Sequence, residues 1–286
     1  MLIYLSGGLG NQFFQLSLAC TFKNTKSVYL STYLLNSFGR KPDISIFAEE
    51  LGIKLVDYKC FCSSIVKENR FREYNDHVDF CCYLGLPDNS PWLYHNDQKK
   101  EFAESILRVA QKVNANEKST RNQLAIHFRL GDYLWPRALF RYGVLSKIYY
   151  QNALLELGNP SIADVFSEDK KALRSIYGKK VLNCSLEMRT SQSTLNDFCS
   201  ILLYEKVIFS NSTFCFWQYW IRDFMNIAYG TKLVSFFPRP MFRSTNIIDG
   251  SLDNVGNFES NFFNPLKLLI SFPASFKRRL RWKPYW

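Results

Sequence analysis

The sequence has little of several features that would mark particular protein classes. It contains only three histidines, at positions 77, 95 and 127, and none has the surroundings of a serine-hydrolase histidine. No apolar run reaches the ~18–20 residues that a membrane-spanning helix needs. Internal repeats and low-complexity segments are also missing from the sequence. We therefore expect neither a Ser–His–Asp hydrolase nor a membrane-spanning protein.

Acidic residues are missing after Glu259, where six lysines and arginines supply more than half of the formal net charge of +11. The rest of the chain is only mildly basic, which argues against a nucleic-acid groove across the main fold. A basic nucleic-acid-binding protein remains the alternative from a different class. Aromatic residues alternate with the terminal cations, as in segments that contact anionic lipid. We expect residues 261–286 to form a basic aromatic tail, either solvated or in peripheral membrane contact through Lys277, Arg278, Arg279, Arg281 and Trp282.

The first residues contain no basic cluster, and the apolar run that starts at Met1 ends at Ser6-Gly7-Gly8. This is not the pattern of a secretory leader, so we expect a cytoplasmic protein, with any membrane contact on the inner face. The eight cysteines are then expected to be reduced and mainly buried. Cys60-x-Cys62 and Cys81-Cys82 lack the usual spacing of zinc ligands, so we expect no metal site.

Two series of alternating strands and helices predict an α/β protein. In the first, strand Leu2–Leu5, a glycine turn, helix Gln12–Lys23 and strand Val28–Thr32 form a βαβ unit. Helices are also expected at Ile44–Leu51 and Gln98–Val113. The polar residues 114–120 read as a linker, so we place an N-terminal, acceptor-side domain at 1–120 and a nucleotide-sugar domain at 121–260.

The second series predicts an open, doubly wound sheet with a ligand at its carboxyl edge. Its expected strands are Leu124–Phe128, Ala163–Ser167, Lys180–Leu182 and Val207–Phe209. Its expected helices are Lys147–Leu157, Asp169–Tyr177, Thr194–Leu203 and one that begins near Ser212.

Polar residues follow three of these strands. His127, Arg129 and Asp132 follow the first, and the guanidinium of Arg129 is suited either to phosphate oxygens or to a structural pair with Asp132. Glu168 and Asp169 follow the second, either as complements to a helix dipole or as acceptors for the two adjacent donors of guanine. After the strand Val207–Phe209 comes a cluster at a helix N-terminus that is suited to phosphate: Ser210, Asn211, Ser212 and Thr213.

A glycine loop precedes the first predicted helix. Gly8-x-Gly10 lacks the third small residue of a dinucleotide fingerprint, and no acid ends the next strand to bind a ribose. The loop is therefore either a tight turn or a place where Gly8, Gly10 and Asn11 contact an anion or a sugar.

Four ordered motifs resemble the bacterial alpha-1,2-fucosyltransferases of glycosyltransferase family 11. The residues from Gly7 to Gln15 resemble the family's GGLGNQ-x-FQ element, and those from His127 to Tyr133 resemble H-x-R-R-G-D-Y. Phe166-Ser167-Glu168-Asp169 is similar to FSDD, and Ser210-Asn211-Ser212-Thr213-Phe214 matches SNSTF. The resemblance covers residues 1 to about 240.

The resemblance implies a GT-B-like pair of Rossmann-like domains with the donor site in the cleft. It also implies GDP-L-fucose as donor, inversion at the anomeric carbon, no metal or other cofactor, and transfer to the 2-hydroxyl of a terminal galactose on a surface glycan such as O-antigen. The acceptor could be lipid-linked. Another GDP-sugar or another linkage is the alternative. Arg129 would then bind the diphosphate, with His127 and Asp169 near the guanosine, and Asp132 and His127 are candidates for the catalytic base.

Several positions depart from the family pattern, among them Phe216, which stands where the family has a Trp, and the segment Tyr204-Glu205-Lys206. Leu130 stands where the family has a second arginine, which removes one cation from the expected diphosphate site. Glu168 replaces an aspartate, which lengthens one side chain by a methylene. These differences bear on acceptor, linkage and turnover more than on the fold.

Overall fold

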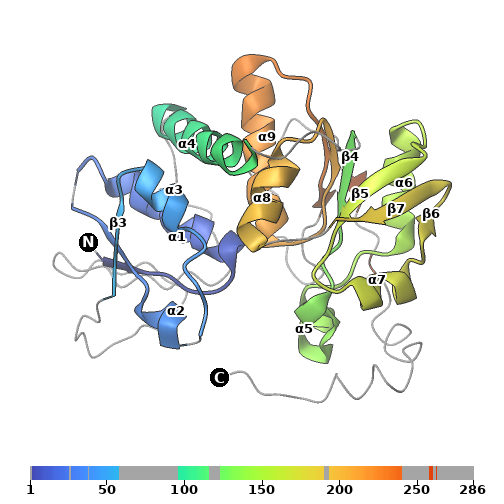
Figure 1. The fold of residues 1–286 in the computed structure, drawn as a ribbon, viewed down its shortest axis with the longest axis horizontal. Helices are drawn as coiled ribbons and strands as arrows, with labels where there is room; N and C mark the ends of the chain where they lie inside the picture. Colours follow the sequence, from blue (N-terminus) through green and yellow to red (C-terminus); the bar gives the residue numbers. More distant parts are fainter. Residues whose placement is uncertain are drawn as a thin grey trace. The chain divides into compact units, whose positions relative to one another are not determined.

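The computed structural model describes residues 2–25, 27–37, 39–57, 96–115, 123–189, 193–239, 258–259 and 262 (Figure 1). The chain divides into two compact units, which are described separately below. The first comprises Met1–Lys118, Gln192–Leu203 and Ile227–Tyr229, and the second Ser119–Ser191, Tyr204–Asn226 and Gly230–Trp286. The predicted tail cations, His77 and the cysteines at 60, 62, 81 and 82 lie outside the described residues.

The first unit contains a parallel three-stranded sheet in the order β1-β2-β3. Its strands are β1 (Leu2–Tyr4), β2 (Tyr29–Ser31) and β3 (Lys54–Val56). Helix α1 (Leu9–Phe22) connects β1 to β2, which confirms the predicted βαβ opening. The remaining helices of this unit are α2 (Tyr33–Ser37), α3 (Ser45–Glu50), α4 (Asn96–Asn114) and α8 (Thr194–Leu202).

Phenylalanine rings from four helices form the core of the first unit. Phe13 of α1 lies with its ring centroid 4.5 Å from Phe198 of α8 and 4.9 Å from Phe47 of α3. Phe102 of α4 contacts Phe13 edge-on at 6.5 Å. Helix α8, which comes late in the sequence, thus completes the core around Phe13. In the described part of the chain, no helix is both long enough and apolar enough to span a membrane.

The second unit contains a six-stranded sheet in the order β6-β7-β5-β4-β8-β9, in which only β6 and β7 pair antiparallel. Its strands are β4 (Leu124–His127), β5 (Ile162–Phe166), β6 (Lys180–Val181), β7 (Cys184–Met188), β8 (Lys206–Ile208) and β9 (Val234–Phe236). Its helices are the 3-10 turn η1 (Gly131–Leu134), α5 (Pro136–Arg141), α6 (Lys147–Glu156), α7 (Lys170–Ile176) and α9 (Thr213–Tyr229). A short parallel pair, β10 (Pro238–Arg239) and β11 (Phe258–Glu259), accompanies it.

The strand order of this sheet reverses between β4 and β8. From β4 the chain proceeds to β5 and β7 on one side, and it then returns to β8 and β9 on the other. In open α/β sheets such a reversal leaves a place for ligands beyond the carboxyl ends of the two central strands. The predicted α/β class with parallel sheets is confirmed, and the arrangement of the two units as in a GT-B fold stays a prediction.

Alternation along β4 determines which face each side chain joins. Leu124, Ile126 and Phe128 belong to the apolar core that also contains residues of α6 and α7. Phe128 packs with its ring centroid 4.2 Å from Tyr150 of α6. His127 faces the opposite way, and its ring lies 5.4 Å from Phe214 in the first turn of α9.

Candidate functional site

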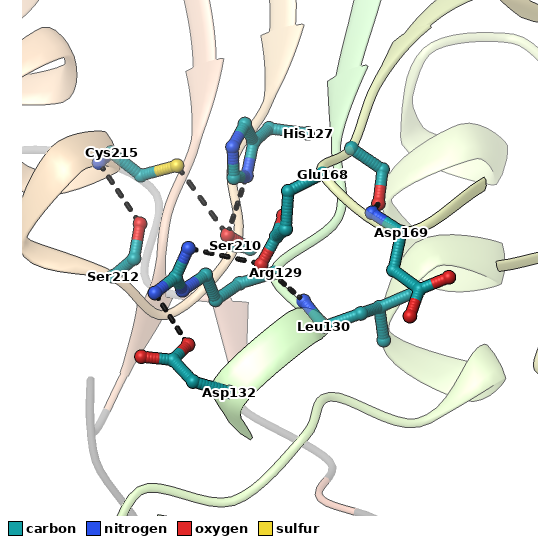
Figure 2. A network of polar contacts seen from close by, with 10 residues as sticks. His127, Arg129, Leu130, Asp132, Glu168, Asp169, Ser210, Ser212 and Cys215 are labelled. Carbon is teal, nitrogen blue, oxygen red and sulfur yellow. Dashed lines mark hydrogen bonds and ion pairs between the residues drawn. The ribbon is translucent and has the colours of Figure 1, made fainter. Parts of the chain in front are cut away.

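Arg129 lies just beyond the end of β4 and is paired with two carboxylates (Figure 2). Its Nη1 donates to Oε1 of Glu168 at 2.9 Å, and its Nη2 donates to Oδ1 of Asp132 at 2.6 Å. The guanidinium carbon also lies 4.9 Å from the ring centroid of Tyr133, a cation–π distance. The side chain is still 29% exposed. Arg129 is therefore a fixed cation with an accessible edge, at the point where the strand order reverses.

Glu168 follows β5 and connects two neighbouring strand ends. Its Oε1 accepts from Arg129 and also from the backbone N–H of Leu130, at 3.2 Å. Gly131 makes room for this carboxylate, because a Cβ there would lie 2.8 Å from Oε1 of Glu168. Gly131 also has a φ of +33°, in the region where side chains are strained. The glycine of the predicted motif thus serves the Arg129–Glu168 pair.

The side chain of Leu130 is fully buried in the apolar core, while its backbone N–H donates to Glu168. In the described residues, Arg129 is the cation that follows β4 in the segment from Phe128 to Leu134, and its binding of a diphosphate stays a prediction.

The charge of Arg129 is stabilised by its surroundings. Burial disfavours the charged guanidinium, but the carboxylates of Glu168 and Asp132 outweigh this effect and raise the pKa of Arg129 above its ordinary value. Arg129 is therefore protonated at physiological pH. Burial also raises the pKa of Tyr133, which keeps this phenol neutral beside Arg129.

His127 is buried and bonded to the strand end of β8. Its Nδ1 lies 2.8 Å from Oγ of Ser210, which in turn lies 3.4 Å from Sγ of Cys215. Burial, followed by repulsion from Arg129, lowers the pKa of His127 from 6.5 to about 3. His127 is therefore a neutral imidazole at physiological pH.

The cluster after β8 has mainly internal contacts. Ser212 is the N-cap of α9 and accepts from the backbone N–H of Cys215 at 3.2 Å. Asn211 donates from Nδ2 to the carbonyls of Tyr142 and Gly143, at 3.0 and 3.1 Å. Thr213 is half-buried as the first residue of α9. These contacts connect α9 to the segment between α5 and α6.

Asp169 is the N-cap of α7. Its Oδ1 accepts from the backbone N–H of Ala172 at 2.9 Å, and its own N–H donates to Oγ of Ser167 at 3.4 Å. One oxygen of each acid of the predicted pair thus has an internal partner. The proposal that these acids bind guanine stays a prediction.

The glycine loop belongs to the first unit and is held by two glutamines. Gln15 accepts from the N–H of Ser6 at 3.0 Å and donates to its Oγ at 2.9 Å. Gln12 donates to the carbonyl of Gly7 at 3.2 Å and accepts from the N–H of Ile44 at 3.2 Å. Gly8 is exposed as the N-cap of α1, and Gly10 and Asn11 lie in the first turn. The side chains of both glutamines, which belong to α1, therefore hold the loop in its conformation.

The second unit thus brings together residues from three strand ends that lie up to 83 positions apart, as between His127 and Ser210. Gly8, Gly10 and Asn11 are in the other unit. Sequence reasoning missed Tyr133 and Cys215. Tyr133 belongs to a predicted motif, whereas no sequence signal distinguishes Cys215 from another buried cysteine. Among the residues described, no group of three or more His, Cys, Asp and Glu side chains is placed to hold a metal ion.

Comparisons with known proteins find only distant similarities to solved structures. No protein-family model and no curated protein matches the sequence. POFUT1 in complex with GDP is 13% identical with a TM-score of 0.32, over 51% of this chain and 52% of that one. POFUT1 in complex with GDP-fucose is 14% identical with a TM-score of 0.31, over 51% of each chain. Another structure of POFUT1 with GDP is 11% identical with a TM-score of 0.41, over 82% of this chain and 96% of that one. The chain spans about half the length of the first two POFUT1 chains. At these identities and TM-scores no family is shown.

Proposed function

We propose that this protein is an inverting glycosyltransferase that uses GDP-L-fucose and transfers fucose to the 2-hydroxyl of a terminal galactose. The proposal combines the four motifs with the geometry of the second unit. Its acceptor would be a surface glycan, and GDP-fucose and that glycan would be its partners.

The observation that carries the proposal is the position of Arg129. A guanidinium with an accessible edge lies at the reversal point of a parallel sheet, and the N-terminus of α9 follows the neighbouring strand. Helix N-termini and arginine forks both favour phosphate oxygens. A nucleoside diphosphate is therefore the class of ligand that suits this edge best.

The chemistry of the proposed reaction needs such a group. When the sugar leaves GDP, negative charge develops on the β-phosphate, and a fixed cation placed there lowers the barrier. Arg129 is held in place by Glu168 and Asp132 before any ligand binds, so it needs little reorganisation. In this proposal Arg129 takes the role that a metal ion has in other transferases.

The acceptor hydroxyl must also lose a proton. His127 is poorly placed to take this proton, because it is only 8% exposed and its Nδ1 is bonded to Ser210. The carboxylate of Asp132 is 49% exposed and contacts Arg129, so it is accessible beside the proposed phosphate site. Of the two candidates from the sequence, we therefore propose Asp132 as the base.

The test is the release of GDP from GDP-fucose in the presence and absence of a β-galactoside, with mass spectrometry of the product. Arg129→Ala should lower kcat/KM by roughly 100-fold or more, about 3 kcal/mol, by analogy with the loss of an oxyanion donor. Arg174→Ala is the matched control, because Arg174 is an exposed arginine at the end of α7 in the same unit. Unchanged turnover in Arg129→Ala would refute the role of Arg129.

A panel of GDP-sugars and acceptors in the same assay separates the alternatives. Turnover with another GDP-sugar but not with GDP-fucose would replace the proposed donor. A fucosylated product with a different linkage would leave the donor and replace the acceptor position.

A further inference from the structure

A chain of three buried side chains, His127, Ser210 and Cys215, runs from β4 to α9 (Figure 2). Ser210 Oγ lies 2.8 Å from Nδ1 of His127 and 3.4 Å from Sγ of Cys215. His127 is 8% exposed, Ser210 1% and Cys215 0%, so water has little access to their polar atoms. Each polar hydrogen of these three side chains must therefore find its acceptor among them or at the carboxyl edge of the sheet.

The protonation states at both ends of the chain follow from burial. Burial raises the pKa of the Cys215 thiol to about 11, so the sulfur keeps its hydrogen. Burial and Arg129 keep His127 neutral, so its ring has one N–H, either on Nδ1 or on Nε2. The tautomer depends on the direction in which the Ser210 hydroxyl donates.

Two arrangements of the hydrogens are available. In one, the thiol donates to Ser210, and the hydroxyl donates to Nδ1 of His127. In the other, Nδ1–H donates to Ser210, and the hydroxyl donates to the sulfur. Sulfur is a weak acceptor, whereas a neutral ring nitrogen accepts well, so the first arrangement uses the hydroxyl hydrogen in the stronger bond.

We propose that Ser210, supported by Cys215, is a positioning residue that fixes His127 as the tautomer protonated on Nε2. His127 then contributes a neutral hydrogen-bond donor next to Arg129. This last step rests on the proposed function, in which the acceptor is an oxygen of the donor nucleotide. Because Leu130 is buried where the family has an arginine, a neutral donor would partly replace the missing cation without a second charge beside Arg129.

The tautomer can be observed directly by NMR on the full chain labelled with 15N-histidine. The sequence has only three histidines, so the spectrum is simple, and His127→Asn assigns the signals of His127. We expect protonation on Nε2 and an Nδ1 resonance typical of a hydrogen-bond acceptor. Protonation on Nδ1 in the unmodified protein would overturn the proposal, and this measurement needs no variant other than the one used for assignment.

Variants test the order of the relay in the same spectrum. Ser210→Ala should shift the Nδ1 resonance, because the nitrogen loses its donor, and Ser210→Thr should restore it. Cys215→Ala should shift it less, since Cys215 reaches His127 only through Ser210. Ser193→Ala is the matched control, because this hydroxyl caps α8 and contacts none of the three residues of the relay. An unmoved resonance in Ser210→Ala, or equal shifts in Ser210→Ala and Cys215→Ala, would contradict the relay.

A kinetic comparison tests the role of the Nε2 hydrogen separately. His127→Asn should raise the KM for GDP-fucose about 5-fold, the effect of one neutral hydrogen bond, with kcat nearly unchanged. His127→Gln, whose amide reaches the position of Nε2, should recover most of this loss. Equal KM values for the protein and both variants would refute the donor role. If GDP-fucose is not turned over at all, the proposed function fails, and the NMR result still decides the relay.

Discussion

Replacing His127 by asparagine should make the stability of the protein less sensitive to acid. In the unfolded chain His127 takes up a proton near its ordinary pKa of 6.5, whereas in the folded protein its pKa is about 3. Between these values the unfolded state binds more protons, so His127 destabilises the fold as the pH falls below 6.5. The slope is about 1.4 kcal/mol for each pH unit, hence about 3 kcal/mol over two units. Asparagine retains a partner for Ser210 but does not titrate.

The assay is urea unfolding of both proteins at a series of pH values from about 7 to about 4.5. All other titrating groups are common to the two proteins, so their difference in unfolding free energy reports His127. Ser212→Ala serves as the control, because the loss of a helix cap should lower stability by about 1 kcal/mol equally at each pH. Parallel curves for His127→Asn and the unmodified protein would refute the conclusion that His127 is buried in its neutral form.

Two further substitutions test the surroundings of Arg129. Glu168→Gln removes a carboxylate that competes with phosphate for Arg129, so calorimetry should show several-fold tighter binding of pyrophosphate. If Glu168 also binds guanine, the same variant should bind GDP more weakly. Gly131→Ala should lower the unfolding free energy by about 1–3 kcal/mol, because it strains a positive φ and places a Cβ against Glu168. In the Glu168→Ala background this loss should shrink, and an equal loss in both backgrounds would show that the contact with Glu168 is not its cause.

The strands that the sequence predicted well are the buried central ones. β4, β5 and β8 lie in the interior of a parallel sheet, where both faces are covered, so their apolar residues run almost without interruption. Cys184–Met188 was not predicted, because β7 is only partly buried and its sequence contains Ser185 and Glu187. Lys180–Leu182 was expected as a further strand, and the structure shows β6 as the antiparallel arm of a hairpin with β7. This hairpin turns at Leu182, a residue with a φ of +52° that no sequence signal marks.

The candidate site was predictable as a set of residue types but not as a set of contacts. Residues after adjacent parallel strands must meet at one edge, so the meeting of Arg129 with Glu168 follows from topology. The sequence placed Ser212 and Asp169 near helix N-termini, and the structure adds that their side chains cap α9 and α7. The contact between Ser210 and Cys215 depends on the first turn of α9 and on burial, neither of which the sequence specifies.

The two glutamines of the glycine loop have a thermodynamic consequence. Because Gln15 bonds Ser6 and Gln12 bonds the carbonyl of Gly7, the loop has its conformation before any ligand arrives. Ordering a flexible loop costs conformational entropy that is subtracted from binding affinity. In this protein that entropy is lost during folding, so a ligand that contacts the loop would meet a preorganised surface.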